Sequence, residues 1–210
     1  MTQTITEYII TQYIEEIDMA RYPEKKPTEA DVEISVMRDH GYFLLMKDID
    51  ADSAHDVVKW IIEENLVKRG KKKSLTLIIH SEGGDLQAGF AIIDTMQGSA
   101  IPIRTIGLGM VASAALCIFM SGEPGNRILT PNTSILSHQY SWHSDGKEHE
   151  LFAAMKEFNL TRDRMLSHYR HCTGLPDEKI REFLLPPQDM WLSAEEALEL
   201  GICDLIKETY

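Results

Sequence analysis

The chain of 210 residues carries 33 acidic and 21 basic side chains, a formal net charge of −12, and 43% of its residues are apolar. This composition is typical of one acidic globular domain, and a chain of this length buries about 70% of its unfolded surface without disulfides or a structural metal. The negative charge argues against nucleic acid or an anionic membrane surface as the main partner, because both are bound through basic surfaces.

Cys117, Cys172 and Cys203 form neither a CxxC pair nor a zinc-binding spacing. An odd number of cysteines suits a reducing compartment, so we expect a cytoplasmic protein with no metal site. Residues 105–122 carry no charged side chain, and an uncharged stretch of this length must be considered as a membrane helix. Glycines and serines interrupt this stretch, so we expect a buried strand, turn and helix in its place. The N-terminus lacks the basic region of a signal peptide.

Residues 1–30 differ from the rest of the chain. Ile5, Ile9, Tyr13 and Ile17 recur every four positions before the sequence PEKKP, which predicts an amphipathic helix followed by a linker. We expect this helix to dock on its own domain or on a neighbouring subunit, in preference to a regulatory or membrane-surface role. The remainder, residues 31–210, is predicted to form a single domain.

Beyond residue 31, apolar strand patterns alternate with helical patterns, which predicts an α/β architecture with a mostly parallel sheet. The strand candidates are Tyr42–Met46, Leu75–Ile79, Ile103–Leu108, Arg127–Leu129 and Ser134–Ser137. The helix candidates are Ser53–Asn65, Leu86–Gln97, Ser113–Met120, a long helix over about residues 147–171, Pro176–Phe183 and Ala194–Leu200.

Two of the predicted strand-to-helix turns are candidates for a functional site. Gly83 and Gly84 follow the strand LTLII and precede a helix, where glycines let the backbone pass close to a ligand. A tight turn without a ligand would have the same sequence. Ser113 opens the helix after the next strand, where a serine is most often only a helix cap and less often a nucleophile.

Two histidines end predicted strands, where reactive groups collect in α/β sheets. His138 ends the strand ILS, and His80 ends LTLII, so His80 is its main competitor. A histidine base needs a carboxylate to orient it, and Asp189, before a capped helix, is a candidate that composition alone does not select. The other histidines are expected to be solvated: His40, His55, His143, His149, His168 and His171.

Four ordered motifs resemble the proteolytic subunit of the ATP-dependent Clp protease, the ClpP family, over roughly residues 41–206. They are SEGGDLQAGFAIIDTMQ, GMVASAA, GNRILTPNTSILSHQ and DMWLSAEEALELGICDLI. The sequence around Ser113 is VASAA and not GxSxG, so a nucleophile elbow of the α/β-hydrolase type is disfavoured.

The resemblance implies a Ser-His-Asp triad of a serine endopeptidase. Ser113 would be the nucleophile, His138 the general base, and Asp189 the acid that orients the base. The backbone N–H groups of Gly84 and Ala114 would form the oxyanion hole, which agrees with the unpaired N–H groups expected in the first turn of a helix. Gly83, Gly84, Gln139 and Tyr140 would bind substrate.

The resemblance also implies a fold and partners. The expected fold is the ClpP/crotonase-like spiral of β-β-α units with a long protruding handle helix, here about residues 147–171. The expected assembly is a homo-oligomeric heptameric ring, single or double, to which a AAA+ Clp ATPase delivers unfolded polypeptides. The chain has no GxxxxGK[ST] motif and would itself need no cofactor.

Several positions depart from the family pattern. Glu82 replaces the proline of SPGG, the segment YSWHSDG replaces a Gly-rich strand, and Gln188-Asp189-Met190 replaces Arg-Asp-Arg. The last two changes bear on contacts between rings, and the N-terminal segment does not resemble the family's axial loop. Two alternatives therefore stay open: a non-catalytic ClpP-like paralogue that modulates an active ring, and a crotonase-fold acyl-CoA enzyme.

Overall fold

The computed structural model describes residues 37–67 and 72–208. The predicted amphipathic helix and linker of residues 1–30 lie outside the described residues. All helices and strands discussed below belong to the unit His40–Tyr210.

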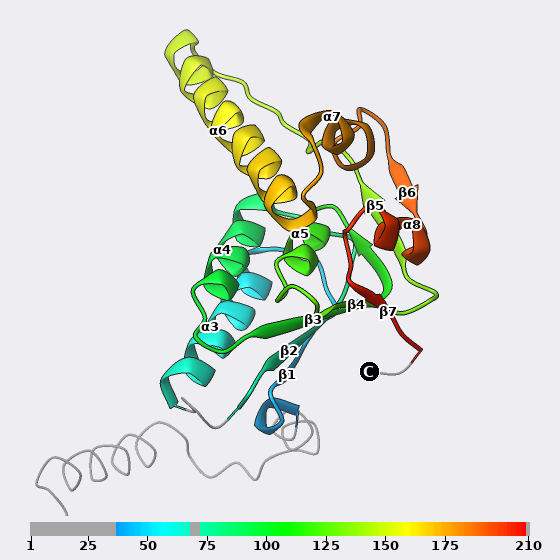
Figure 1. The fold of residues 1–210 in the computed structure, drawn as a ribbon. Helices are drawn as coiled ribbons and strands as arrows, with labels where there is room; N and C mark the ends of the chain where they lie inside the picture. Colours follow the sequence, from blue (N-terminus) through cyan, green and yellow to red (C-terminus); the bar gives the residue numbers. More distant parts are fainter. Residues whose placement is uncertain (1–36, 68–71, 209–210) are drawn as a thin grey trace, which may run out of the picture. The chain divides into compact units, whose positions relative to one another are not determined.

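A seven-stranded, mostly parallel sheet forms the centre of this unit (Figure 1). Its main path runs in the order β1-β2-β3-β4-β7, all parallel. The strands are β1 (Tyr42–Leu45), β2 (Leu75–Ser81), β3 (Ile103–Ala112), β4 (Arg127–Leu129), β5 (Ser134–Ser137), β6 (Met190–Leu192) and β7 (Leu205–Ile206).

Strand β3 is the long strand that connects two parts of the sheet. Its first half, Thr105–Gly107, pairs with β4, whereas its end, Met110–Ala112, pairs with β5. Strand β6 then adds to β5 in antiparallel orientation. The end of β3 is therefore surrounded by strands from distant parts of the sequence, which is where α/β sheets collect functional groups.

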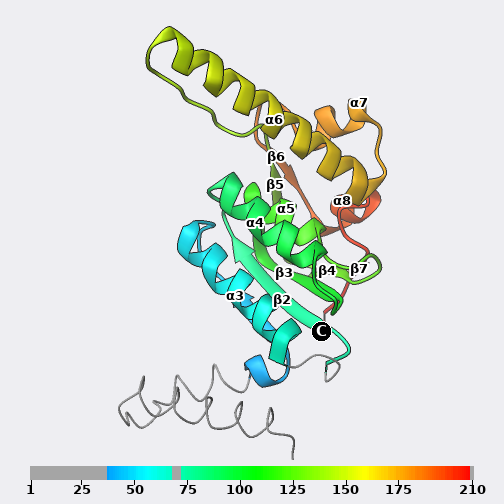
Figure 2. The ribbon, with the colours of Figure 1, turned by 90° about the vertical axis from the view of Figure 1, so that its left-hand side faces the viewer.

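The helices are α3 (Ala51–Val67), α4 (Leu86–Gln97), α5 (Ala114–Met120), α6 (Glu148–Thr173), α7 (Asp177–Lys179) and α8 (Ala194–Glu199), with a π-helix at Ile180–Leu184. Helices α3, α4 and α5 cover one face of the sheet, and α6 extends away from it, as Figures 1 and 2 show. Trp60 of α3, Phe119 of α5 and Tyr169 of α6 are fully buried in the core. The α/β fold with a long handle helix is confirmed.

The charge-free stretch at residues 105–122 forms most of β3 and all of α5. Every residue of α5 is buried, and burial explains the absence of charge. In the described part of the chain, no helix is both long and apolar enough to cross a membrane.

Two differences from the predicted elements have simple reasons. The predicted helix Pro176–Phe183 is a short α-helical turn, α7, followed by the π-helix Ile180–Leu184. In the π-helix the N–H of Leu185 donates to the carbonyl of Ile180, five residues earlier, in place of the four-residue spacing of an α-helix. Strands β6 and β7 were not predicted, since three and two residues are too short to show a strand pattern.

One ion pair, between Arg127 of β4 and Asp204 before β7, stabilises the edge of the sheet at which these two strands pair. The Asp204 carboxylate accepts hydrogen bonds from Arg127 Nε at 2.9 Å and Nη2 at 2.5 Å, and from the backbone N–H groups of Gly125 and Arg127. Arg127 Nη1 also donates to the carbonyl of Cys172 at the end of α6. Burial opposes ionisation of Asp204, but the hydrogen bonds from Arg127 prevail and lower the pKa of the carboxyl.

We expect Asp204→Asn to lower the free energy of unfolding by about 3 kcal/mol at pH 7, because it leaves the Arg127 guanidinium buried without its counter-charge. The folded pKa lies below the unfolded value of about 3.9, so the stabilisation is complete above that pH and is lost as the pH falls through the folded pKa. Denaturant titrations of wild type and Asp204→Asn should show that the difference between their free energies of unfolding becomes smaller below about pH 4.

The matched control is Asp177→Asn, which breaks the exposed Arg170–Asp177 pair, with side chains 51% and 45% exposed. An exposed pair contributes less than about 1 kcal/mol, so this variant should be close to wild type. Equal losses in the two variants would contradict a special role for the Arg127–Asp204 pair.

Candidate active site

Ser113 occupies a sharp turn between β3 and α5. Its φ of 52° and ψ of −122° make it the one non-glycine residue with positive φ among those described. Such a backbone costs about 1–3 kcal/mol and is concentrated at functional sites. The Ser113 side chain makes no capping hydrogen bond to α5, while its N–H donates to the carbonyl of Leu136 in β5. Ser113 therefore occupies the N-cap position without capping α5 through its side chain, and its hydroxyl is available for chemistry.

The two glycines after β2 lie directly against this turn. Gly83 and Gly84 have φ values of 100° and 142°. A Cβ on Gly83 would come within 2.7 Å of Ser113 Cβ, and one on Gly84 within 2.3 Å of the Ile49 carbonyl oxygen. The bridge to Ile49 uses the carbonyl of Gly83 and the N–H of Asp85, so the Gly84 N–H takes no part in it. Glycine is required here by both conformation and space.

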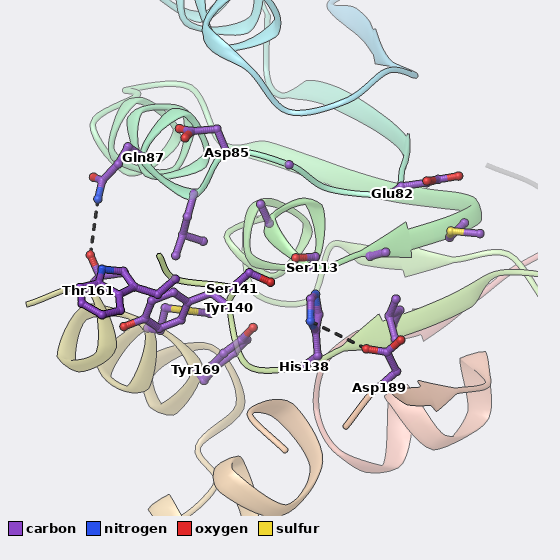
Figure 3. Close-up of a pocket in the computed structure, with 18 of the residues that line it drawn as sticks. Glu82, Asp85, Gln87, Ser113, His138, Tyr140, Ser141, Thr161, Tyr169 and Asp189 are labelled. Atoms are coloured by element: carbon purple, nitrogen blue, oxygen red, sulfur yellow. Dashed lines mark hydrogen bonds and ion pairs between the residues drawn. The ribbon is translucent and has the colours of Figure 1, made fainter. Parts of the chain in front are cut away.

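The pairing of β5 with β6 brings His138 and Asp189 together. Ser137, the last residue of β5, pairs with Met190, the first residue of β6. His138 follows β5 and Asp189 precedes β6, so the two residues become neighbours. His138 Nδ1 lies 3.8 Å from Asp189 Oδ1, which is an ion-pair distance and too long for a hydrogen bond. Figure 3 shows the His138 ring between Ser113 and Asp189.

A cavity of about 730 Å³ joins these groups. Ser113, His138, Asp189, Gly84 and Ala114 all line it. The cavity thus contains a hydroxyl, an imidazole, a carboxylate and the first turn of a helix, which is the set of groups that acyl transfer requires. No cluster of three or more metal-ligating side chains occurs in residues 37–67 and 72–208.

The remaining predicted binding residues separate into two groups. Tyr140 lines the cavity, and its hydroxyl donates to the carbonyl of Phe158 in α6. Gln139 does not line it: the Gln139 N–H donates to the carbonyl of Pro186, and its side-chain amide to that of Leu185. Gly83 lies behind Ser113 and is also absent from the cavity wall. We therefore expect Gln139 and Gly83 to support the site without touching substrate.

His80 lies outside the cavity. The pairing of β3 with β2 shifts register beside His80, and Gly109 of β3 has a φ of 61°, which is where a strand bends. His80 Nδ1 is 3.0 Å from the carbonyl of Leu108 and 3.2 Å from the N–H of Met110, so His80 supports this bend in β3.

The expectation that His168 is solvated is wrong, because it is 8% exposed and its Nε2 lies 2.9 Å from the Cys117 carbonyl. Burial lowers the pKa of His168, which keeps it neutral against α5.

The sequence motifs did not include the part of the cavity that α6 supplies. Glu157, Thr161, Met165 and Tyr169 line it at intervals of four residues, which places them on one face of the helix. The four-residue spacing was visible in the sequence. Only the contact of α6 with α5, and the hydrogen bonds from Gln87 of α4 to Glu157 and Thr161, show that this face borders the site.

Comparisons with known proteins show the family and the fold of this chain. The family model described as Clp protease matches residues 25–210. The chain is 31% identical over 158 residues to an ATP-dependent Clp protease proteolytic subunit from Deinococcus radiodurans, covering 75% of this chain and 76% of the relative. A ClpP1 mutant from Listeria monocytogenes has a structure with a TM-score of 0.73 and 28% identity, covering 84% of this chain and 96% of that one.

The structural match shows that the chain has the fold of a ClpP-like protease. The chain belongs to the Clp protease family, which is a family of serine proteases.

Proposed function

We propose that this chain is an active serine endopeptidase of the ClpP type. Ser113 is the nucleophile, His138 the general base and Asp189 the acid that orients it. The observation that carries this proposal is the single cavity that Ser113, His138 and Asp189 line together with Gly84 and Ala114. Family membership supports the reaction class, and the strained, uncapped Ser113 supports the choice of nucleophile.

The proposed reaction follows from the roles of these groups. His138 takes the proton of Ser113 as the hydroxyl attacks the peptide carbonyl, and returns it to the leaving amine. The N–H groups of Gly84 and Ala114 stabilise the oxyanion, each contributing about 2.7–4 kcal/mol to the barrier reduction. Water then hydrolyses the acyl-enzyme with His138 again as base. The 3.8 Å separation of His138 and Asp189 shortens in the substrate complex, as is common in catalytic sites.

The proposed assembly is a homo-oligomeric ring of seven subunits, single or double, that receives unfolded polypeptides from a AAA+ Clp ATPase in the cytoplasm. Exposed apolar side chains on α6 support a subunit contact along this helix: Leu151, Phe152, Met155 and Leu160. Residues 138–147 form no helix or strand, and Gln188-Asp189-Met190 stands where the family has Arg-Asp-Arg. A contact between two rings would therefore differ from that of the family. The cysteines Cys117, Cys172 and Cys203 are unbridged, which supports a reducing compartment.

One observation favours a second function, that of a non-catalytic subunit in a ring with an active partner. Asp189 is 63% exposed and does not reach hydrogen-bond distance from His138. A carboxylate in this position orients the imidazole less firmly than a buried one. The crotonase-type acyl-CoA function has no such support, because it leaves the Ser-His-Asp arrangement without a role.

A fluorophosphonate probe separates the two functions. We expect stoichiometric labelling of Ser113, located by peptide mass mapping, because the probe reacts only with a serine that a base activates. Native mass spectrometry of the same sample should give an oligomer of seven subunits or a multiple of seven. The absence of labelling in a correctly assembled ring would favour the non-catalytic function, and a monomer or dimer would contradict the compartment.

A further inference from the structure

The cavity has an end, distant from Asp189, that lies between α4 and α6. Gln87 and Thr161 are at this end in Figure 3, together with Tyr140, Ser141 and Tyr169. The Glu157 carboxylate lines the same end. We call this part of the cavity, defined by Gln87, Tyr140, Glu157, Thr161 and Met165, the α4–α6 end.

Two hydrogen bonds hold the Glu157 carboxylate in place. Gln87 Nε2 donates to Glu157 Oε1 at 2.8 Å, and Thr161 Oγ1 donates to the same oxygen at 2.6 Å. Thr161 is 3% exposed, so its position is fixed by packing. In the described part of the chain, Oε2 of Glu157 has no hydrogen-bond donor and the carboxylate has no Lys or Arg partner within 4.0 Å. Glu157 is an exposed residue, so its carboxylate is an oriented anion at the solvent-facing side of the cavity, with one oxygen that accepts no hydrogen bond from the described residues.

The walls that lead to this carboxylate are apolar. Met165 lies two helical turns from Glu157 on the same face of α6, and it is buried. The Tyr140 ring packs on Phe158, with centroids 5.5 Å apart. Burial, and then the negative charge of Glu157, raise the pKa of Tyr140, so the carboxylate and this wall share one environment. An apolar wall beside an exposed, oriented carboxylate fits a side chain with a long aliphatic stem and a cationic head.

The charge of the whole cavity has the same sign. Its lining contains four carboxylates, those of Glu82, Asp85, Glu157 and Asp189, and no Lys or Arg side chain of the described residues. A concave surface with one sign of charge attracts the opposite charge and repels acidic side chains. The other three carboxylates therefore add to the negative charge of Glu157 and favour the same ligand chemistry.

We propose that the α4–α6 end of the cavity binds a Lys or Arg side chain adjacent to the scissile bond, and that Glu157, held by Gln87 and Thr161, recognises its charge. This preference rests on the proposed peptidase function and specifies its substrate class. Glu157 acts in specificity and takes no part in the bond-breaking steps.

The test compares quenched fluorescent peptides that differ at one position, with lysine or its uncharged analogue norleucine in an alanine-rich background. We expect wild-type kcat/KM to be about tenfold higher for the lysine peptide, because the lysine ammonium gains a charge-assisted hydrogen bond to the Glu157 carboxylate that norleucine cannot make. Mass spectrometry should place the cut next to the lysine. Glu157→Gln should lower kcat/KM about tenfold for lysine and less than about twofold for norleucine.

The matched control is Glu148→Gln, which removes the same charge from another exposed position of α6 that does not line the cavity. It should leave the ratio between the two peptides unchanged. Equal Ser113-dependent cleavage of both peptides by wild type, or an equal effect of Glu157→Gln on both, would overturn the preference and leave the peptidase function intact.

Binding to Ser113→Ala, followed by fluorescence anisotropy of the same labelled peptides, keeps the proposal testable without turnover. We expect the lysine peptide to bind about tenfold more tightly than the norleucine peptide, and Glu157→Gln in this background to remove the difference. Equal binding would refute the preference even if no peptide is cleaved, whereas a preference without cleavage would refute the peptidase function alone.

Discussion

Ser113→Ala is expected to lower kcat/KM for a short fluorogenic peptide by about 10⁶-fold, close to the background rate, because the acyl-enzyme has no other nucleophile. The fold should be unaffected. The Ser113 hydroxyl makes no hydrogen bond to the end of α5, and Ala and Ser share the same strain at a φ of 52°. The free energy of unfolding should therefore change by less than about 0.5 kcal/mol.

Steady-state kinetics and a denaturant titration of the same preparations check this result. Ser134→Ala is the matched control, since it removes a hydroxyl from an exposed position of β5 and should retain wild-type activity. Undiminished cleavage by Ser113→Ala would refute Ser113 as nucleophile, and a large loss of stability would show that its hydroxyl has a structural role.

Gly83→Ala is expected to lower kcat/KM by at least about 10²-fold, because the reacting groups would be displaced by a fraction of an ångström or more. The new Cβ would lie 2.7 Å from Ser113 Cβ, 2.8 Å from the Ala112 carbonyl oxygen and 3.0 Å from the Ala114 nitrogen. Two of these atoms belong to the backbone, which cannot yield as a flexible side chain can. The substitution therefore moves both the proposed nucleophile and one oxyanion donor. Peptide hydrolysis and fluorophosphonate labelling of Gly83→Ala measure the effect.

Gly125→Ala is the control that distinguishes the steric contact of a new Cβ from the backbone strain of a non-glycine residue at positive φ. Gly125 has a φ of 84°, close to that of Gly83, but a Cβ there would meet no atom within 4 Å. We expect Gly125→Ala to cost about 1–2 kcal/mol of stability and to leave kcat/KM unchanged. Gly83→Ala with normal kinetics would mean that the turn between β3 and α5 tolerates displacement and that its geometry is not critical.

The local elements of this protein could largely be predicted from sequence. Strands Arg127–Leu129 and Ser134–Ser137 and helix Leu86–Gln97 have the predicted bounds, because clear turn residues flank compact apolar patterns. The charge-free stretch at residues 105–122 was correctly expected to be strand, turn and helix. The short strands β6 and β7 could not be predicted, because they exist only through pairing with β5 and β4.

The candidate triad was found in a different way. Ser113, His138 and Asp189 were selected by resemblance to a family, since Ser113 alone had an ordinary structural explanation, Asp189 was one acid among many, and His80 was the main competitor of His138. The tertiary structure separates the two histidines: His80 supports the bend in β3, and His138 lies beside Asp189 through the register of β5 and β6.

By itself, the sequence determined the fold class and the family, and its resemblance to the family supplied the candidate residues for acyl transfer, because these depend on local patterns and ordered motifs. The tertiary structure alone decided which groups share the cavity with Ser113. Glu157 and Gln87 are 70 residues apart in the chain, and their hydrogen bond exists only because α4 and α6 meet. Long-range packing sets the distance between side chains, and on that distance the proposed specificity of this protein depends.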